Sequence, residues 1–170
     1  MKNLFFILML VYGMQLQAQK TLKIINLTST PIQVDDIITS TATGGFPQYH
    51  SKQFGVFSIP AFGTFTIVNA TNTTRFPFVS NPVSTPSFNG APGWERFSSA
   101  LVSTISPSNV AWIAGSTQVF YRIQVTKAGN SKIIGASFSG VPTTLTSNGW
   151  TASYVLTGVA PVQNYTITIQ

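Results

Sequence analysis

Hydrophobic and polar residues alternate along much of the chain, and this pattern predicts β-strands. In TQVFYRIQV, residues 117–125, alternation places four residues on one face: Val119, Tyr121, Ile123 and Val125. The same alternation assigns Arg122 to the opposite face and leaves Phe120 as an exposed exception. Residues 64–70 and 164–170 alternate in the same way, and β-branched and aromatic residues dominate these runs. Such runs are typical of half-buried strands in antiparallel sheets.

Turn residues between the runs predict hairpins. Asn148-Gly149 is the strongest signal, because both residues tolerate the positive φ of a type I′ turn. We expect this turn to form two cross-strand pairs: Ser147 with Trp150, and Leu145 with Ala152.

Two further hairpins are predicted by Gly-containing connections. Ala-Gly-Asn-Ser, residues 128–131, separates runs at 119–127 and 132–138, and IPAFGTF separates runs at 52–59 and 64–70. With strands near 21–27 and 31–38, the chain has eight or nine strands and no long helix. We therefore expect an all-β fold, an antiparallel β-sandwich, of either jelly-roll or immunoglobulin-like topology.

Three segments do not follow this alternation clearly. Residues 95–105 fit either a helix or a strand, and their Ser and Thr content favours a strand or an irregular edge. Residues 71–94 hold four prolines and form the longest expected loop, while residues 39–51 form a shorter one. Long loops of this kind often carry function. The segment FNGAPGWERF, residues 88–97, is the most distinctive part, because it combines Trp, Glu and Arg.

The N-terminal segment predicts export. Lys2 is followed by a short apolar run from Leu4 to Met14 and by a small residue, Ala18. These are the parts of a secretory signal peptide, and the run is too short for a stable transmembrane span. We expect residues 1–18 to be removed and residues 19–170 to form a single β-sandwich domain. The expected location is the bacterial periplasm, the cell surface or the medium.

Composition limits the chemistry that this chain can carry. Charged residues make up 7% of it, against about 25% in an ordinary soluble domain, and 40 residues are Ser or Thr. The formal net charge is +6, but the basic residues are scattered, so we expect no nucleic-acid binding. There is no cysteine, which excludes disulfides and catalytic thiolates.

Enzymatic sites have few candidate residues. A glycosidase needs two carboxylates, which Asp36 and Glu95 could supply, although Asp35 and Asp36 end a strand where acids often face solvent. A serine hydrolase would need His50, for which we favour an exposed position in a loop. One His and no Cys argue against a zinc site, and no phosphate-binding loop is present, so no metal or cofactor is expected. We expect no enzymatic activity.

Binding is the better-supported class. Trp94, Glu95, Arg96 and Tyr49 are the expected contact residues, because aromatic and polar groups in loops anchor glycans and proteins. We expect an exported binding or assembly module that contacts an envelope protein or a glycan through loops at one end of the sandwich. A protein could also pair with an unpaired edge strand, such as residues 164–170.

Two alternatives stay open, and a third is set aside. The first is a carbohydrate-active hydrolase that uses Asp36 and Glu95. The second is a pore-forming β protein, which residues 97–125 fit in part, although Pro107 and Arg122 interrupt any long membrane strand. The third, a flat ice-binding ladder, is not expected, because the Thr-x-Thr pairs at 28–30, 64–66 and 166–168 share no common period.

Overall fold

The computed structural model describes residues 19–51, 57–69, 94–99, 101–105, 118–159 and 162–170, with only the backbone described at residues 69, 94, 95 and 101–105. The strands are β1 (Gln19–Asn26), β2 (Ile32–Thr41), β3 (Gln48–His50), β4 (Phe57–Ile59), β5 (Thr64–Asn69), β6 (Trp94–Ser98), β7 (Leu101–Ile105), β8 (Gln118–Lys127), β9 (Asn130–Gly135), β10 (Thr144–Ser147), β11 (Trp150–Thr157) and β12 (Val162–Ile169). A short 3-10 helix, η3, spans Ser137–Ser139. The predicted leader, residues 1–18, lies outside the described residues.

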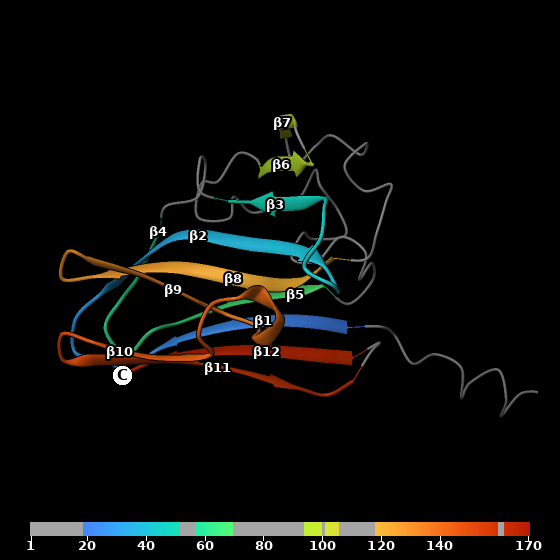
Figure 1. Ribbon diagram of the computed structural model, residues 1–170. Coiled ribbons are helices and arrows are strands. Elements are labelled where there is room, and N and C mark those ends of the chain that lie inside the picture. The colour runs from blue at the N-terminus through green and yellow to red at the C-terminus, as the bar shows by residue number, and fades with distance from the viewer. Residues whose placement is uncertain (1–18, 52–56, 70–93, 100, 106–117, 160–161) are drawn as a thin grey trace, which may run out of the picture.

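The strands form two packed sheets, which confirms the predicted all-β sandwich (Figure 1). Sheet A has five strands in the order β10-β11-β12-β1-β5. Sheet B has seven strands, in the order β7-β6-β3-β2-β8-β9, with β4 also paired to β2. The strand count exceeds the predicted eight or nine, because short strands such as β3 and β4 have too few residues to show alternation.

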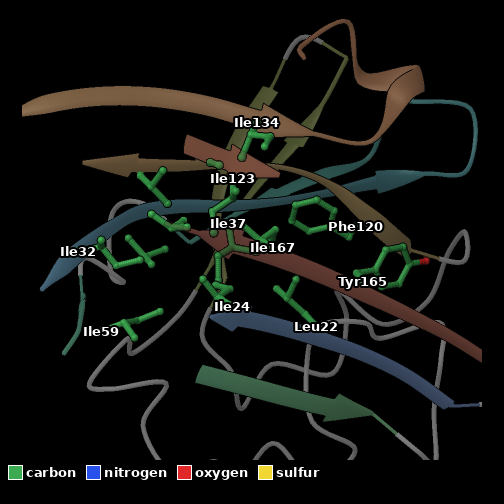
Figure 2. Packing of buried hydrophobic residues seen from close by; sticks show 14 of the residues in the cluster. Leu22, Ile24, Ile32, Ile37, Ile59, Phe120, Ile123, Ile134, Tyr165 and Ile167 are labelled. Atoms are coloured by element: carbon green, nitrogen blue, oxygen red, sulfur yellow. The ribbon is translucent and has the colours of Figure 1, made fainter. Parts of the chain in front are cut away.

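The core lies between the two sheets and is built from alternate residues of their strands. Figure 2 shows Leu22, Ile24 and Ile167 of sheet A packed near Ile37 and Ile123 of sheet B. All five side chains are fully buried. Each such aliphatic side chain contributes roughly 1.5–3 kcal/mol when it leaves water. Because the chain has no disulfide, this burial and the strand hydrogen bonds stabilise the sandwich.

Sheet A contains one parallel pair, β1 with β12, and its other pairs are antiparallel. A parallel pair needs a long crossover connection, and here the rest of the chain provides it. β12 is hydrogen-bonded to β11 on one side and to β1 on the other. The expectation of an unpaired edge strand at residues 164–170 is therefore wrong.

Sheet B contains two β-bulges in the β2–β8 pair, at Asp35 and at Tyr121. A bulge adds one residue to a strand and interrupts the alternation of faces. As a result Phe120 is fully buried in the core, while Tyr121 is half-buried on the opposite side. The prediction that Tyr121 faces the core and Phe120 is exposed is wrong for this reason.

Two of the three predicted hairpins are confirmed. Asn148-Gly149 joins β10 and β11 with the two predicted residue pairs, and both residues have positive φ, 39° and 79°. Ala128 and Gly129 join β8 and β9, so the turn is two residues shorter than the predicted connection at 128–131. The IPAFGTF hairpin is wrong, because β4 pairs with β2 in sheet B and β5 pairs with β1 in sheet A. The turn between them crosses from one sheet to the other.

The described parts of the ambiguous segment 95–105 are mainly strand, as the Ser and Thr content favoured. β6 and β7 form an antiparallel pair at the edge of sheet B, with Trp94 opposite Ile105. The predicted loop at 39–51 is shorter than expected, because β2 continues to Thr41 and β3 begins at Gln48. No helix in the described part of the chain is long and apolar enough to cross a membrane.

Candidate functional site

The residues that carry chemistry meet where β3 lies between β2 and β6 in sheet B (Figure 1). His50 in β3 is paired with Ile38 in β2 and with Glu95 in β6, and Ile38 is in turn paired with Arg122 in β8. Paired residues of neighbouring strands share one face of a sheet. Ile38 is buried but is not part of the inter-sheet core. This row therefore marks the side of sheet B that faces away from sheet A, called here the outer face of sheet B.

Asp36 and His50 form a hydrogen-bonded pair on this face. The His50 Nδ1 atom lies 2.8 Å from a carboxylate oxygen of Asp36. The other oxygen of Asp36 accepts a hydrogen bond of 3.4 Å from the Ser51 hydroxyl. Because an ionised carboxylate can only accept, the Nδ1 atom of His50 carries the proton in this pair. The pair fixes the orientation of the imidazole ring against β2.

These positions correct two predictions from the sequence. Asp36 is 2% exposed and so does not face solvent at a strand end. His50 lies in a strand rather than in a loop, and its side chain is 13% exposed. The first error arises because β2 continues to Thr41, so that Asp36 lies inside the strand and not at its end. The bulge at Asp35 then places Asp36 on the face on which His50 lies.

Aromatic and backbone contacts complete the surroundings of the pair. The Phe97 ring packs against the His50 ring, with a centroid distance of 4.4 Å. The hydroxyl of Ser51 accepts a hydrogen bond of 2.7 Å from the Ile37 amide. The Asp36–His50 pair is therefore held from both neighbouring strands. It can orient a histidine, as hydrolases do, but no described hydroxyl donates to the other ring nitrogen of His50.

Two predicted contact residues, Tyr49 and Arg96, contact each other. They are paired between β3 and β6, and the Arg96 guanidinium donates a hydrogen bond to the Tyr49 hydroxyl. Tyr49 is 3% exposed and belongs to the core cluster, so it cannot offer a ring face to a partner. Burial raises the pKa of Tyr49, and the positive charge of Arg96 partly offsets this rise. Tyr49 and Arg96 thus join β3 to β6 from the side opposite His50.

The remaining predicted contact residues, Trp94 and Glu95, begin β6. Their backbone is extended and paired with β7, so this end of FNGAPGWERF is a strand and not the predicted loop. Their side chains and residues 88–93 lie outside the described part of the structure. Glu95 is the strand partner of His50, which places it in the same row as Ile38 and Arg122.

Sequence analysis missed a polar connection between the sheets at the end where β1 begins. Lys20 is 3% exposed and its Nζ atom donates a hydrogen bond of 2.6 Å to the Gln118 carbonyl. The Gln118 side chain in turn accepts a hydrogen bond of 3.0 Å from the Thr39 hydroxyl. Burial lowers the pKa of Lys20 from 10.5 to about 8. The alternation of β1 was a usable signal, because Lys20 has the same phase as Leu22 and Ile24.

A metal site of three or more His, Cys, Asp or Glu side chains is not found among the described residues. Trp150 is 2% exposed at the start of β11. Comparison of the chain with protein-family models, with curated proteins and with solved structures finds no match.

Proposed function

We propose that the chain is an exported, non-enzymatic binding or assembly module of the bacterial cell envelope or surface, which contacts a glycan or a protein partner through the outer face of sheet B. One observation carries this proposal. In a chain with few charged residues, the two bulges bring Asp36 and Tyr121 to the face on which Asp35, His50 and Arg122 lie. Bulges commonly re-aim side chains next to functional sites.

The burial and the hydrogen bonds of Asp36 support binding rather than hydrolysis. A carboxylate that protonates or attacks a glycosidic bond must reach that bond. Asp36 is 2% exposed, and its two oxygens already accept hydrogen bonds from His50 and Ser51. The alternative, a carbohydrate-active hydrolase that uses Asp36 and Glu95, would require Asp36 to give up these partners.

The exposed aromatic rings favour a glycan over a protein partner. Glycan sites combine open aromatic faces with a few polar groups that fix orientation. Phe46 and Phe138 are 52% and 43% exposed, and Gln48 lies close by, bonded to the Gly44 carbonyl at 3.3 Å. The C-terminal strand, which could have accepted a partner's strand, is already paired on both sides.

A pull-down from the native envelope, run beside a glycan array, tests the proposal. Phe46→Ala removes an exposed aromatic ring from the loop between β2 and β3, and Phe62→Ala is the matched control, because Phe62 is 70% exposed in the β4–β5 turn. Anchor residues typically contribute about 2 kcal/mol, or roughly thirtyfold in affinity. We expect Phe46→Ala to bind at least that much more weakly, with Phe62→Ala unchanged.

Two results would count against the proposal. If neither a glycan nor an envelope protein is captured, the chain is not a binding module of this kind. If the captured glycan is shortened during incubation, the hydrolase alternative is correct instead.

A further inference from the structure

The bulge in β8 creates a second group of side chains on the outer face of sheet B. In the β2–β8 pair, Arg122 is opposite Ile38 and Phe120 is opposite Thr39, so Tyr121 is the extra residue. Tyr121 therefore turns away from the core and lies next to Arg122. The guanidinium carbon of Arg122 is 5.0 Å from the centroid of the Tyr121 ring, which is a cation–π contact.

A second aromatic ring stands beside this pair. Phe138, in η3, has its ring centroid 5.8 Å from that of Tyr121. The loop between β2 and β3 covers one edge of Tyr121, where a Cβ atom on Gly44 would lie 3.3 Å from the ring. Tyr121 is thus held in place by its neighbours, while Phe138 remains 43% exposed. Together the two rings form an aromatic surface next to the Arg122 guanidinium.

Arg122 has no acidic partner within the part of the chain that the structure describes. Its Nε atom is buried and no acceptor lies within hydrogen-bond distance. The nearest acid by strand register, Asp36, turns its carboxylate towards His50 on the other side of β2. Partly buried guanidinium groups in proteins are normally paired with an anion, because an unpaired charge is costly to remove from water. Among the described residues the Arg122 guanidinium therefore lacks an anionic partner, and this observation points to a ligand.

We propose that Tyr121, Arg122 and Phe138 bind an acidic sugar, a pyranose ring that carries a carboxylate. This inference rests on the proposed function and specifies the class of glycan. A guanidinium group binds a carboxylate through two parallel N–H···O hydrogen bonds, which a lysine cannot reproduce. The apolar face of the sugar ring packs on the exposed face of Phe138, as saturated rings do on aromatic side chains.

Oligogalacturonate is a suitable probe, and its fully methyl-esterified form is the matched control, because only the carboxylate is changed. The full-length chain is expressed in a bacterial host and titrated with both oligomers by isothermal titration calorimetry. We expect the acidic oligomer to bind roughly tenfold or more tightly than the ester, since hydrogen bonds to charged groups are the strong ones. We also expect added salt to weaken binding of the acid selectively.

Four variants, one of them a control, separate the roles of the side chains. Arg122→Gln should lower affinity for the acidic oligomer roughly tenfold or more, and Arg122→Lys should recover only part of the loss. Lys132→Gln is the matched control, because it removes an exposed positive charge from the neighbouring strand β9 and should change affinity by less than about twofold. Phe138→Ala should weaken binding about tenfold, since it removes the exposed ring.

Thermal unfolding of each variant shows whether it is folded. If Arg122→Gln does not fold, Phe138→Ala and the ester comparison carry the test.

The inference is overturned if the wild type binds neither oligomer, if it binds acid and ester equally, or if Arg122→Gln binds like Lys132→Gln. Capture of a neutral glycan or of a protein that depends on Phe46 would overturn it while leaving the proposed function intact. An envelope pull-down and array without any captured partner would instead overturn the proposed function itself.

Discussion

Sheet A keeps one uninterrupted register through all its strand pairs, whereas the β2–β8 pair of sheet B shifts register twice. In sheet A the phase of each strand therefore holds from end to end, and every second residue faces the core. In sheet B each shift moves one residue out of phase, which brings Asp36 and Tyr121 to the outer face. Regular pairing builds the core, and the irregular pairs position the chemically active side chains.

The outer faces of the two sheets differ accordingly. The strands of sheet A place hydroxyl side chains on theirs: Thr21, Thr64, Thr66, Thr144, Thr146, Thr151, Ser153, Thr166 and Thr168. Two Thr-x-Thr pairs, in β5 and β12, share this face although their sequence positions have no common period. Lys23 and Ile25 of β1 lie between them, so the hydroxyls do not form a continuous ladder.

Charged and aromatic groups gather on the outer face of sheet B instead. Asp35 accepts hydrogen bonds from Gln33 at 2.6 Å and from Thr126 at 2.6 Å, and Asp36 accepts one from His50. A chain with three acids has thus placed two of them side by side on one face. We therefore expect substitutions in sheet B to remove specific contacts, and substitutions in sheet A to change only the general stability of the strands.

The two neighbouring acids of β2 should differ most. Asp36→Ala leaves His50 and Ser51 without their buried partner and should lower the free energy of unfolding by about 4 kcal/mol. Asp35→Ala removes a half-exposed acid and should cost less than about 1 kcal/mol. Urea unfolding of both variants measures the difference. Equal losses would mean that the Asp36–His50 pair contributes no more than a surface contact.

Lys20 is the exception on the inner side of sheet A, and its burial makes stability depend on pH. The pKa of Lys20 is about 8 in the folded chain, against 10.5 when it is free. A lowered lysine pKa means that the fold favours the neutral form of Lys20. The stability that goes with neutral Lys20 is therefore fully present above pH 10.5 and is lost as the pH falls to 8. By linkage, the free energy of unfolding changes by ~3 kcal/mol across this range.

Lys20→Met tests this directly. We expect the free energy of unfolding of the wild type to rise relative to that of Lys20→Met between pH 8 and pH 10.5. The buried tyrosines also make stability depend on pH, since burial raises the pKa of Tyr154 to about 12. This effect is the same in both proteins, so it cancels when one free energy of unfolding is subtracted from the other. A constant difference across this range would show that Lys20 is solvated.

Gly135 tests whether the bulge needs close packing. A Cβ atom there would lie 2.4 Å from the Tyr121 carbonyl oxygen and 2.8 Å from the Arg122 Cα atom. Gly135→Ala should therefore cost about 2 kcal/mol, because backbone atoms must move. Gly129→Ala, where a Cβ meets nothing within 4 Å, should cost about 1 kcal/mol from its positive φ of 78°. If Gly129→Ala proves the more costly variant, steric crowding at the bulge is not important.

The smallest effects concern the two hairpins, one in each sheet. Asn148 at the first turn position of the β10–β11 hairpin has a φ of 39°, and Asn148→Ala should lose about 1 kcal/mol. Ala128 occupies the matching position of the β8–β9 hairpin with a φ of 48°, and Ala128→Asn should gain up to about 1 kcal/mol. Thermal unfolding measures both, and shifts in the same direction would contradict the account.

The sequence predicted what depends on local pattern. Alternation and Asn148-Gly149 were enough for the all-β fold and for the pairing of Ser147 with Trp150. The bulges could not be read from it, because the run around Phe120 and Tyr121 is equally hydrophobic in either phase. The residue types alone marked Asp36 and His50 as candidates for chemistry, but the pair that they form depends on β3 pairing with β2. Such pairing between distant segments leaves no local signature.

The central claim is that the bulge in β8 buries Phe120 and presents Tyr121 beside Arg122. Because the chain has no cysteine, single-cysteine variants report exposure without interference. The rate at which a thiol reagent modifies Phe120→Cys and Tyr121→Cys in the folded protein is the most direct test. The account predicts that Tyr121→Cys reacts at least about a hundredfold faster, since a core position reacts only through opening of the structure. Equal rates, or faster modification of Phe120→Cys, would contradict it.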